Sequence, residues 1–76
     1  MEEELARDQV PVERKVFSFA LKQNPRGRFL KITEDVGGHR DAIIIPSSGL
    51  TQVRSAIDRM IEADAKAGPP PVDPDA

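Results

Sequence analysis

The chain has 76 residues, with 13 acidic and 11 basic side chains and no Cys, Trp or Tyr. A chain this short forms one small domain, and three Phe give it a thin core of the kind that usually needs a partner. Without Cys there is no disulfide framework, and one His leaves too few ligands for a zinc site. The apolar runs are short and the first residues are acidic, which predicts no membrane span and no signal peptide. We therefore expect a cytoplasmic protein without a cofactor, with association with the nucleoid as an alternative.

Charge is distributed unevenly along the chain. Residues 1–11 carry a net charge of −3, residues 12–46 a net charge of +3, and residues 47–76 a net charge of −2. A local positive field attracts a polyanion even when the whole chain is slightly acidic. The central segment is therefore a candidate nucleic-acid-binding region, although a run of charges is also typical of an ordinary solvated surface.

The first twelve residues give an ambiguous pattern. Glu2–Asp8 could begin a helix, but Pro11 would end that helix near Val10. Leu5, Val10 and Val12 provide little apolar surface for a strand. Because Pro11 has no N–H to donate, any strand here lies at a sheet edge or is broken.

Residues 13–36 form the most clearly patterned part of the chain. In Glu13–Gln23 and again in Arg28–Val36, apolar and polar residues alternate with the period of two that a half-buried strand shows. The intervening Asn24-Pro25-Arg26-Gly27 has turn chemistry, since Pro presets φ and Gly accepts a positive φ. The segment therefore predicts a β-hairpin. Its apolar face consists of Phe17, Phe19, Leu21, Leu30 and Ile32.

The register of this hairpin determines which side chains point away from the core. The two strands share one apolar face only if Leu21 pairs with Leu30. The same register places Phe29 on the opposite, polar face, across from Lys22. An aromatic ring among cations is a platform on which a nucleobase stacks while its phosphates bind nearby, and a Phe buried in a dimer contact is the alternative. The candidate site residues are Lys22, Gln23, Asn24, Arg26, Arg28, Phe29 and Lys31.

A further strand follows the hairpin. Gly37-Gly38 predicts a two-residue turn, since such a turn needs positive φ. The returning strand then brings Ile43 opposite Ile32 on the apolar face. Ile44 falls beside Lys31 on the polar face, which suggests that something covers part of that face. The register also predicts two cross-strand charge pairs, a favourable one of Asp35 with Arg40 and an unfavourable one of Glu34 with Asp41.

A helix and a tail complete the chain. Pro46 ends the strand, and Ser47-Ser48 offers an N-cap. Gly68 is the predicted end of the helix, and residues 68–76 are Pro-rich and acidic, which is typical of a disordered tail. The domain is therefore expected over residues 1–67, with its clearest part at 13–67. The helix carries one apolar stripe, formed by Leu50, Val53, Ile57, Met60 and Ile61.

The string Lys22–Ile32 (Lys-Gln-Asn-Pro-Arg-Gly-Arg-Phe-Leu-Lys-Ile) resembles the hairpin of a PUR repeat. This is the repeat of the purine-rich-element-binding Pur-alpha family and of its single-repeat bacterial relatives, and the resemblance runs from about Glu4 to Ala67. It implies an α+β fold, with an antiparallel sheet of three to four strands, the first of them before the hairpin, and one C-terminal helix across the apolar face. Since PUR repeats intertwine in pairs and exchange helices, the resemblance also implies a homodimer.

The resemblance implies a function as well, namely binding of single-stranded DNA or RNA with a preference for purine-rich or G-rich strands. Lys22 and Arg26 would contact phosphates or guanine edges, and Asn24 a base edge. Phe29 would stack on a base or wedge against a duplex end. The remaining cations of the hairpin, Arg28 and Lys31, would add positive field.

The alternative is a structural or protein-interaction dimer module that binds no nucleic acid. Ser18 stands where the family carries a second aromatic residue, and the acidic ends of the chain also favour this alternative. We do not expect an enzyme, because the sequence shows no nucleophile–base pair, metal-binding cluster or Gly-rich phosphate loop. Neither a membrane nor a small-molecule substrate is expected as a partner.

Overall fold

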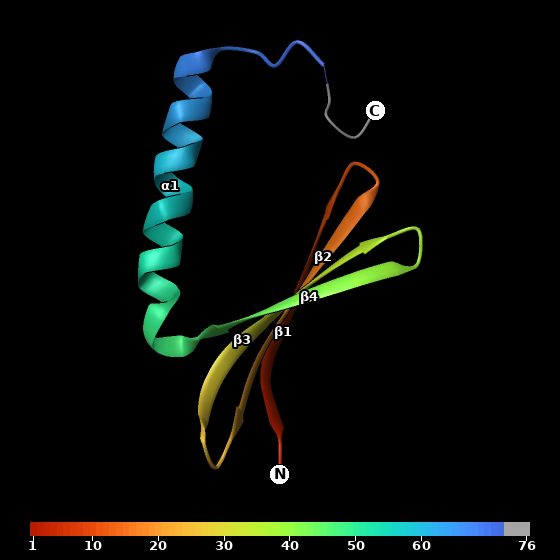
Figure 1. Ribbon diagram of the computed structural model, residues 1–76, viewed down its shortest axis with the longest axis vertical. Helices are drawn as coiled ribbons and strands as arrows, with labels where there is room; N and C mark the ends of the chain where they lie inside the picture. The colour runs from red at the N-terminus through yellow and green to blue at the C-terminus, as the bar shows by residue number, and fades with distance from the viewer. Residues whose placement is uncertain (73–76) are drawn as a thin grey trace.

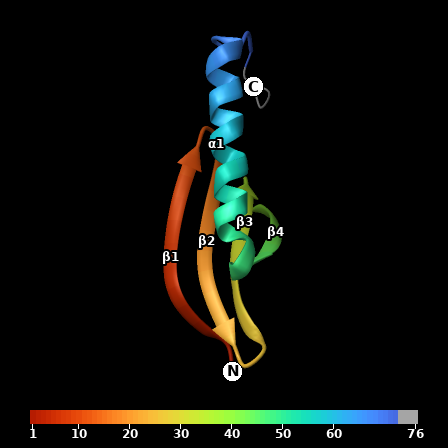
Figure 2. The ribbon, with the colours of Figure 1, turned by 90° about the vertical axis from the view of Figure 1, so that its left-hand side faces the viewer.

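The computed structural model describes residues 1–72 of the chain. Four strands form one antiparallel sheet in the order β1-β2-β3-β4, and a helix follows (Figures 1 and 2). This arrangement confirms the predicted α+β class, with four strands rather than three. The elements are β1 (Glu3–Val12), β2 (Lys15–Asn24), β3 (Gly27–Val36), β4 (His39–Pro46), a 3₁₀ turn η1 (Ser47–Gly49) and α1 (Leu50–Ala67).

The hairpin of β2 and β3 has the predicted register. Leu21 pairs with Leu30, and Lys22 with Phe29. The strand β2 begins at Lys15 and not at Glu13 as predicted. Glu13 has a φ of +55° and belongs to the turn between β1 and β2. Alternation alone could not show this, since a turn residue is as polar as a solvent-facing strand residue.

The hairpin of β3 and β4 also follows the prediction. Its turn residues Gly37 and Gly38 have φ values of +60° and +90°, which glycine adopts without steric cost. Ile32 pairs with Ile43, as the register requires. Glu34 does lie opposite Asp41, and the Lys15 Nζ lies 3.0 Å from a carboxylate oxygen of Glu34, so a neighbouring cation offsets the repulsion.

The ambiguous first segment forms a ten-residue edge strand, as the resemblance implied. Pro11 pairs with Val16 at the outer edge of the sheet, where its missing N–H breaks no second ladder. The pairing of β1 with β2 shifts by one residue between Glu4 and Ala6, which leaves Leu5 as a β-bulge. The bulge changes the face of the residues before it, so Glu4 pairs with Lys22 and points to the polar face.

The helix begins later than the sequence suggested. Ser47 and Ser48 form the 3₁₀ turn η1, and Gly49 is the N-cap of α1, with no side-chain capping hydrogen bond. The predicted end is confirmed, since α1 stops at Ala67 and Gly68 follows with a φ of +79°.

The expectation that the helix covers the apolar face of its own sheet is wrong for the single chain. Figure 1 shows α1 leaving the end of β4 and running beside the sheet, and it makes no more than isolated contacts with the strands. Only the three residues of η1 separate β4 from α1, so this short link sets the direction in which the helix leaves. The stripe residues Ile57, Met60 and Ile61 are accordingly 55%, 63% and 61% exposed.

Burial within the single chain is low. In residues 1–72 Ala20, at 6% exposure, is the only buried apolar residue, while Phe17 and Phe19 are half-buried. Among the same residues, no helix is both long and apolar enough to cross a membrane. Residues 69–72 belong to no helix or strand, and the rest of the predicted disordered tail, residues 73–76, lies outside the described residues.

Candidate nucleic-acid interface

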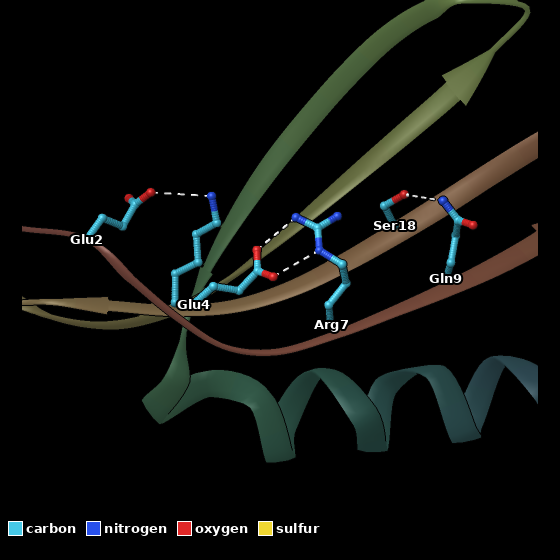
Figure 3. A network of polar contacts seen from close by, with 6 residues as sticks. Glu2, Glu4, Arg7, Gln9 and Ser18 are labelled. Atoms are coloured by element: carbon cyan, nitrogen blue, oxygen red, sulfur yellow. Dashed lines mark hydrogen bonds and ion pairs between the residues drawn. The ribbon is translucent and has the colours of Figure 1, made fainter.

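The polar face of the sheet lies on the side away from α1. Alternation along β2 and β3 places Ser18, Lys22, Phe29, Lys31 and Thr33 on this face, because paired residues point to the same side. Figure 3 shows the Ser18 side chain projecting from the sheet on the side opposite the helix. The apolar residues of the hairpin therefore point toward the helix side, and the polar face remains open.

Phe29 is the centre of the cationic part of this face. It pairs with Lys22 on β2 and with Pro46 on β4, and it is half-buried between them. Lys31, two residues farther along β3, points to the same side. Within residues 1–72 the ammonium group of Lys31 forms no ion pair, so this cation is open to an anionic ligand.

The hairpin tip is held by its own side chain. Asn24 Oδ1 accepts a hydrogen bond of 2.9 Å from the backbone N–H of Arg26, an arrangement that stabilises the turn. The oxygen of Asn24 is therefore engaged, and its NH₂ group is the part that can donate to a base. The Arg26 residue itself is exposed at the tip.

Gln23 and Arg28 lie on the opposite face from Phe29. They pair with each other, and Nε and Nη2 of Arg28 donate to Gln23 Oε1 at 3.1 and 3.0 Å. Gln23 Nε2 in turn donates to Glu3 Oε1 at 3.1 Å. The candidate residues therefore divide into three groups: Lys22, Phe29 and Lys31 on the polar face, Asn24 and Arg26 at the tip, and Gln23 and Arg28 behind it.

Acidic side chains of β1 and of the residue before it lie next to the cations of the polar face. Glu2 Oε1 is 3.3 Å from Lys22 Nζ, and Glu4 accepts two hydrogen bonds from Arg7, 3.0 Å from Nε and 2.8 Å from Nη2 (Figure 3). The hydrogen bonds from Arg7, followed by its charge, hold the pKa of Glu4 below its ordinary value. A nucleic acid that reaches Lys22 must therefore displace Glu2.

Arg7 and Gln9 are polar-face residues that the sequence did not reveal. They pair with Ser18 and Ala20, whose side chains point to this face, in the register that begins at the turn between β1 and β2. There they border a groove of about 410 Å³ whose floor includes Ser18 and Thr33. The polar residues at 7 and 9 were the available signal, but only the pairing of β1 with β2 shows which face of the sheet they occupy.

Comparison with known proteins places these residues in a family context. A family model described as "PurA ssDNA and RNA-binding protein" matches residues 2–75. Transcription factor Pur-alpha 1 of Arabidopsis thaliana is 52% identical over 48 residues, which are 63% of this chain and 16% of that protein. In Homo sapiens, transcriptional activator protein Pur-alpha is 38% identical and transcriptional regulator protein Pur-beta 34% identical, each over 68 residues or 88% of this chain.

These relatives are much longer than this chain. The matched segment is 21% of human Pur-alpha and 22% of human Pur-beta, so the chain spans about a fifth of the length of the curated relatives it matches. The family match includes the whole hairpin, on which the resemblance to a PUR repeat was based.

Proposed function

This chain belongs to the PurA family of single-stranded DNA- and RNA-binding proteins, and we propose that it binds a single strand of nucleic acid on the polar face of its sheet. The observation that carries the proposal is the placement of Phe29 beside Lys22, with Lys31 on the same face. An aromatic ring accepts a base by stacking, and the two ammonium groups bind the flanking phosphates. Arg26 and the NH₂ group of Asn24 extend this surface at the hairpin tip.

The preferred ligand under this proposal is a purine-rich strand of DNA or RNA in the cytoplasm. The resemblance of the hairpin to the PUR repeat supports the purine preference, and the larger stacking surface of purines agrees with a single aromatic platform. The proposed role is binding without catalysis, in keeping with a family of nucleic-acid-binding proteins. Arg28, on the opposite face, would contribute positive field at the tip, and neither it nor the uncharged Gln23 would contact a stacked base directly.

We propose further that the binding unit is a homodimer. The single chain leaves two apolar surfaces without cover, the apolar face of the sheet and the stripe of α1 that includes Ile57 and Met60. The hydrophobic effect favours their burial, and a second copy of the chain offers the complementary surface for each. A dimer also doubles the number of cationic platforms that one strand can reach.

One observation favours the rival function, a protein-interaction module. Ile44 is 55% exposed and pairs with Lys31 on the polar face, where a nucleic acid gains little from an aliphatic side chain. A protein partner on this face would bury Ile44 and Phe29 together. The two functions differ in their salt dependence, because only nucleic-acid binding releases many condensed counterions.

The proposed function is tested with the double variant Lys22→Ala and Arg26→Ala. We expect it to bind single-stranded purine-rich DNA more weakly than the wild type and with a flatter salt dependence. Each lost phosphate contact lowers the slope of log K against log salt by about 0.7 for a single strand. Fluorescence anisotropy with a labelled strand at several salt concentrations measures both quantities.

The matched control is Arg54→Ala with Arg59→Ala, which removes two exposed cations from α1. The control should keep the wild-type slope. A wild-type protein that shows no salt-dependent binding to purine-rich or pyrimidine-rich strands of DNA or RNA would overturn the proposed function and favour the interaction module.

A further inference from the structure

A second hollow lies on the polar face, apart from the Phe29 platform. It is the groove of about 410 Å³ that Arg7 and Gln9 of β1 border, with Val16, Ser18 and Thr33 beneath it. Thr33 is four residues beyond Phe29 on β3, which places the groove about 13 Å from the ring at roughly 3.3 Å per residue. A base that occupies the groove is therefore a different base from the one on Phe29.

The amide of Gln9 is held in place at this groove. Gln9 Nε2 donates a hydrogen bond of 3.3 Å to Ser18 Oγ, across the pair that Gln9 and Ser18 form in the ladder (Figure 3). This bond engages one amide hydrogen and leaves the second hydrogen and the Oε1 oxygen for a ligand. A side chain that presents a donor and an acceptor side by side, with its orientation fixed, suits the reading of a base edge.

We propose that this groove is a second nucleotide subsite, in which Gln9 reads the edge of an adenine in the same single strand that stacks on Phe29. The inference rests on the proposed function and names a specificity-determining residue for it. An amide forms a bidentate pair with adenine, accepting from N6 and donating to N7. Since Ser18 offers no aromatic ring, the base in this groove is held by its edge and not by stacking.

The charges around the groove agree with an edge-reading site. At one end, Arg7 lies between Glu4 and the Ser18–Gln9 pair (Figure 3), and its Nη1 donates no hydrogen bond within the described part of the chain. This guanidinium edge is available for the phosphate of the bound nucleotide. At the other end, Asp35 is neutralised by Arg40, whose Nε lies 3.0 Å from Asp35 Oδ2.

Lys31 connects the two subsites. It lies two residues from Phe29 and two from Thr33, on the same face. A strand that runs from the platform to the groove passes this ammonium group, which forms no ion pair in residues 1–72. The order of contacts along the strand is then a stacked base, a phosphate on Lys31 and an edge-read adenine.

The test uses single strands of alternating guanine and adenine in which one adenine at a time is replaced by 7-deazaadenine. This analogue has a C–H group in place of N7 and so removes the acceptor for the Gln9 amide. For the wild-type chain we expect a loss of about two- to tenfold in affinity at one substituted position, the size of one hydrogen bond, and little at the others. If no position costs affinity although the wild type binds the parent strand, the subsite is refuted.

The same strands are then bound to Gln9→Met, which keeps the length of the side chain and removes its hydrogen bonds. We expect this variant to bind the parent strand more weakly than the wild type and to show no further loss with 7-deazaadenine. The matched control Gln52→Met changes an exposed glutamine of α1 and should retain the wild-type pattern. A Gln9→Met protein that still discriminates between adenine and its analogue contradicts the assignment.

The two proposals fail differently in this experiment. If the wild type binds none of the strands, the proposed function itself is refuted. In another outcome, the wild type binds all of the strands with equal affinity for adenine and 7-deazaadenine at every position, and substitution of Phe29 weakens binding. That outcome would support the proposed function and refute the Gln9 subsite. A purely structural role of Gln9 would change thermal stability without changing the ratio of affinities for the two bases, and that result also overturns the subsite.

Discussion

At the scale of single residues, Phe29 is the side chain whose substitution best distinguishes an effect on nucleic-acid affinity from an effect on stability. It is half-buried on the polar face between Lys22 and Pro46, whereas Phe19 points to the apolar face. We expect Phe29→Ala to lower single-strand affinity roughly five- to a hundredfold, as loss of a stacking aromatic does, with its salt dependence retained. Thermal unfolding should change little. The comparison variant Phe19→Ala should instead lower the melting temperature, and a Phe29→Ala protein that melts early yet binds as well as the wild type would contradict the stacking role.

Glu2 is a second residue whose effect on binding can be tested separately from folding, because its carboxylate forms an ion pair with Lys22. The carboxylate is 3.3 Å from Lys22 Nζ, and a phosphate has to replace it. An exposed pair of this kind contributes about 0.2–1 kcal/mol, so Glu2→Gln should raise single-strand affinity by up to about fivefold at low salt, and less as salt screens the pair. The control Glu62→Gln, which removes the partner of Lys66 on α1, should leave affinity unchanged. Equal affinities of the wild type and Glu2→Gln at low salt would mean that Lys22 does not exchange Glu2 for the strand.

At the scale of elements, the turn between β3 and β4 depends on an ionised carboxylate. Asp35 accepts from Arg40 Nε at 3.0 Å and from the backbone N–H of Gly38 at 2.9 Å, and these hydrogen bonds, that from Arg40 first, lower its pKa. A depressed folded-state pKa gives stability that is present above the unfolded value, near 3.8, and is lost as pH falls through the lower folded value. The acid-induced loss of stability should therefore include a contribution from this turn.

The variant Asp35→Asn tests this dependence. It keeps an oxygen for Gly38 but loses the charge, so we expect a lower melting temperature than the wild type at neutral pH. Below the folded pKa of Asp35 the two proteins should melt at similar temperatures, because the wild type is then uncharged at this position as well. Asp58→Asn on α1, at an exposed position, is the control. A constant difference between Asp35→Asn and the wild type at all pH values would show that the charge is not the cause.

At the scale of the whole molecule, the apolar surfaces that one chain leaves open predict self-association. Sedimentation at micromolar concentration should give about twice the mass of one chain. Ile57→Glu changes a side chain that is 55% exposed in the single chain, so in a monomer it would be nearly neutral. In the proposed dimer it buries a charge, and we expect early, concentration-dependent melting. Gln52→Glu, on the exposed side of α1, should behave as the wild type does, and a stable folded monomer would remove the dimer from the proposal.

The sequence by itself determined the central hairpins of this protein. Alternation of period two, with turn chemistry at Asn24–Gly27 and at Gly37-Gly38, specifies the pairing of Leu21 with Leu30 and of Ile32 with its partner on β4. These signals are local, since a turn fixes the register and the alternation then carries it along both strands. The position of Phe29 on the polar face follows from the same rule, so the amino-acid sequence alone is enough to predict it.

Only the tertiary structure decided how the edges of the molecule are arranged. The pairing of β1 with β2 assigns Arg7 and Gln9 to the polar face, and the bulge at Leu5 brings Glu4 to the same face as Lys22. The direction of α1 depends on the short link η1 and on which apolar surface is there to receive the helix, and neither is encoded in the helical stripe itself. A strand's bulge and a helix's docking are set by contacts between distant segments, and for such contacts the periodicity of one segment carries no information about the other.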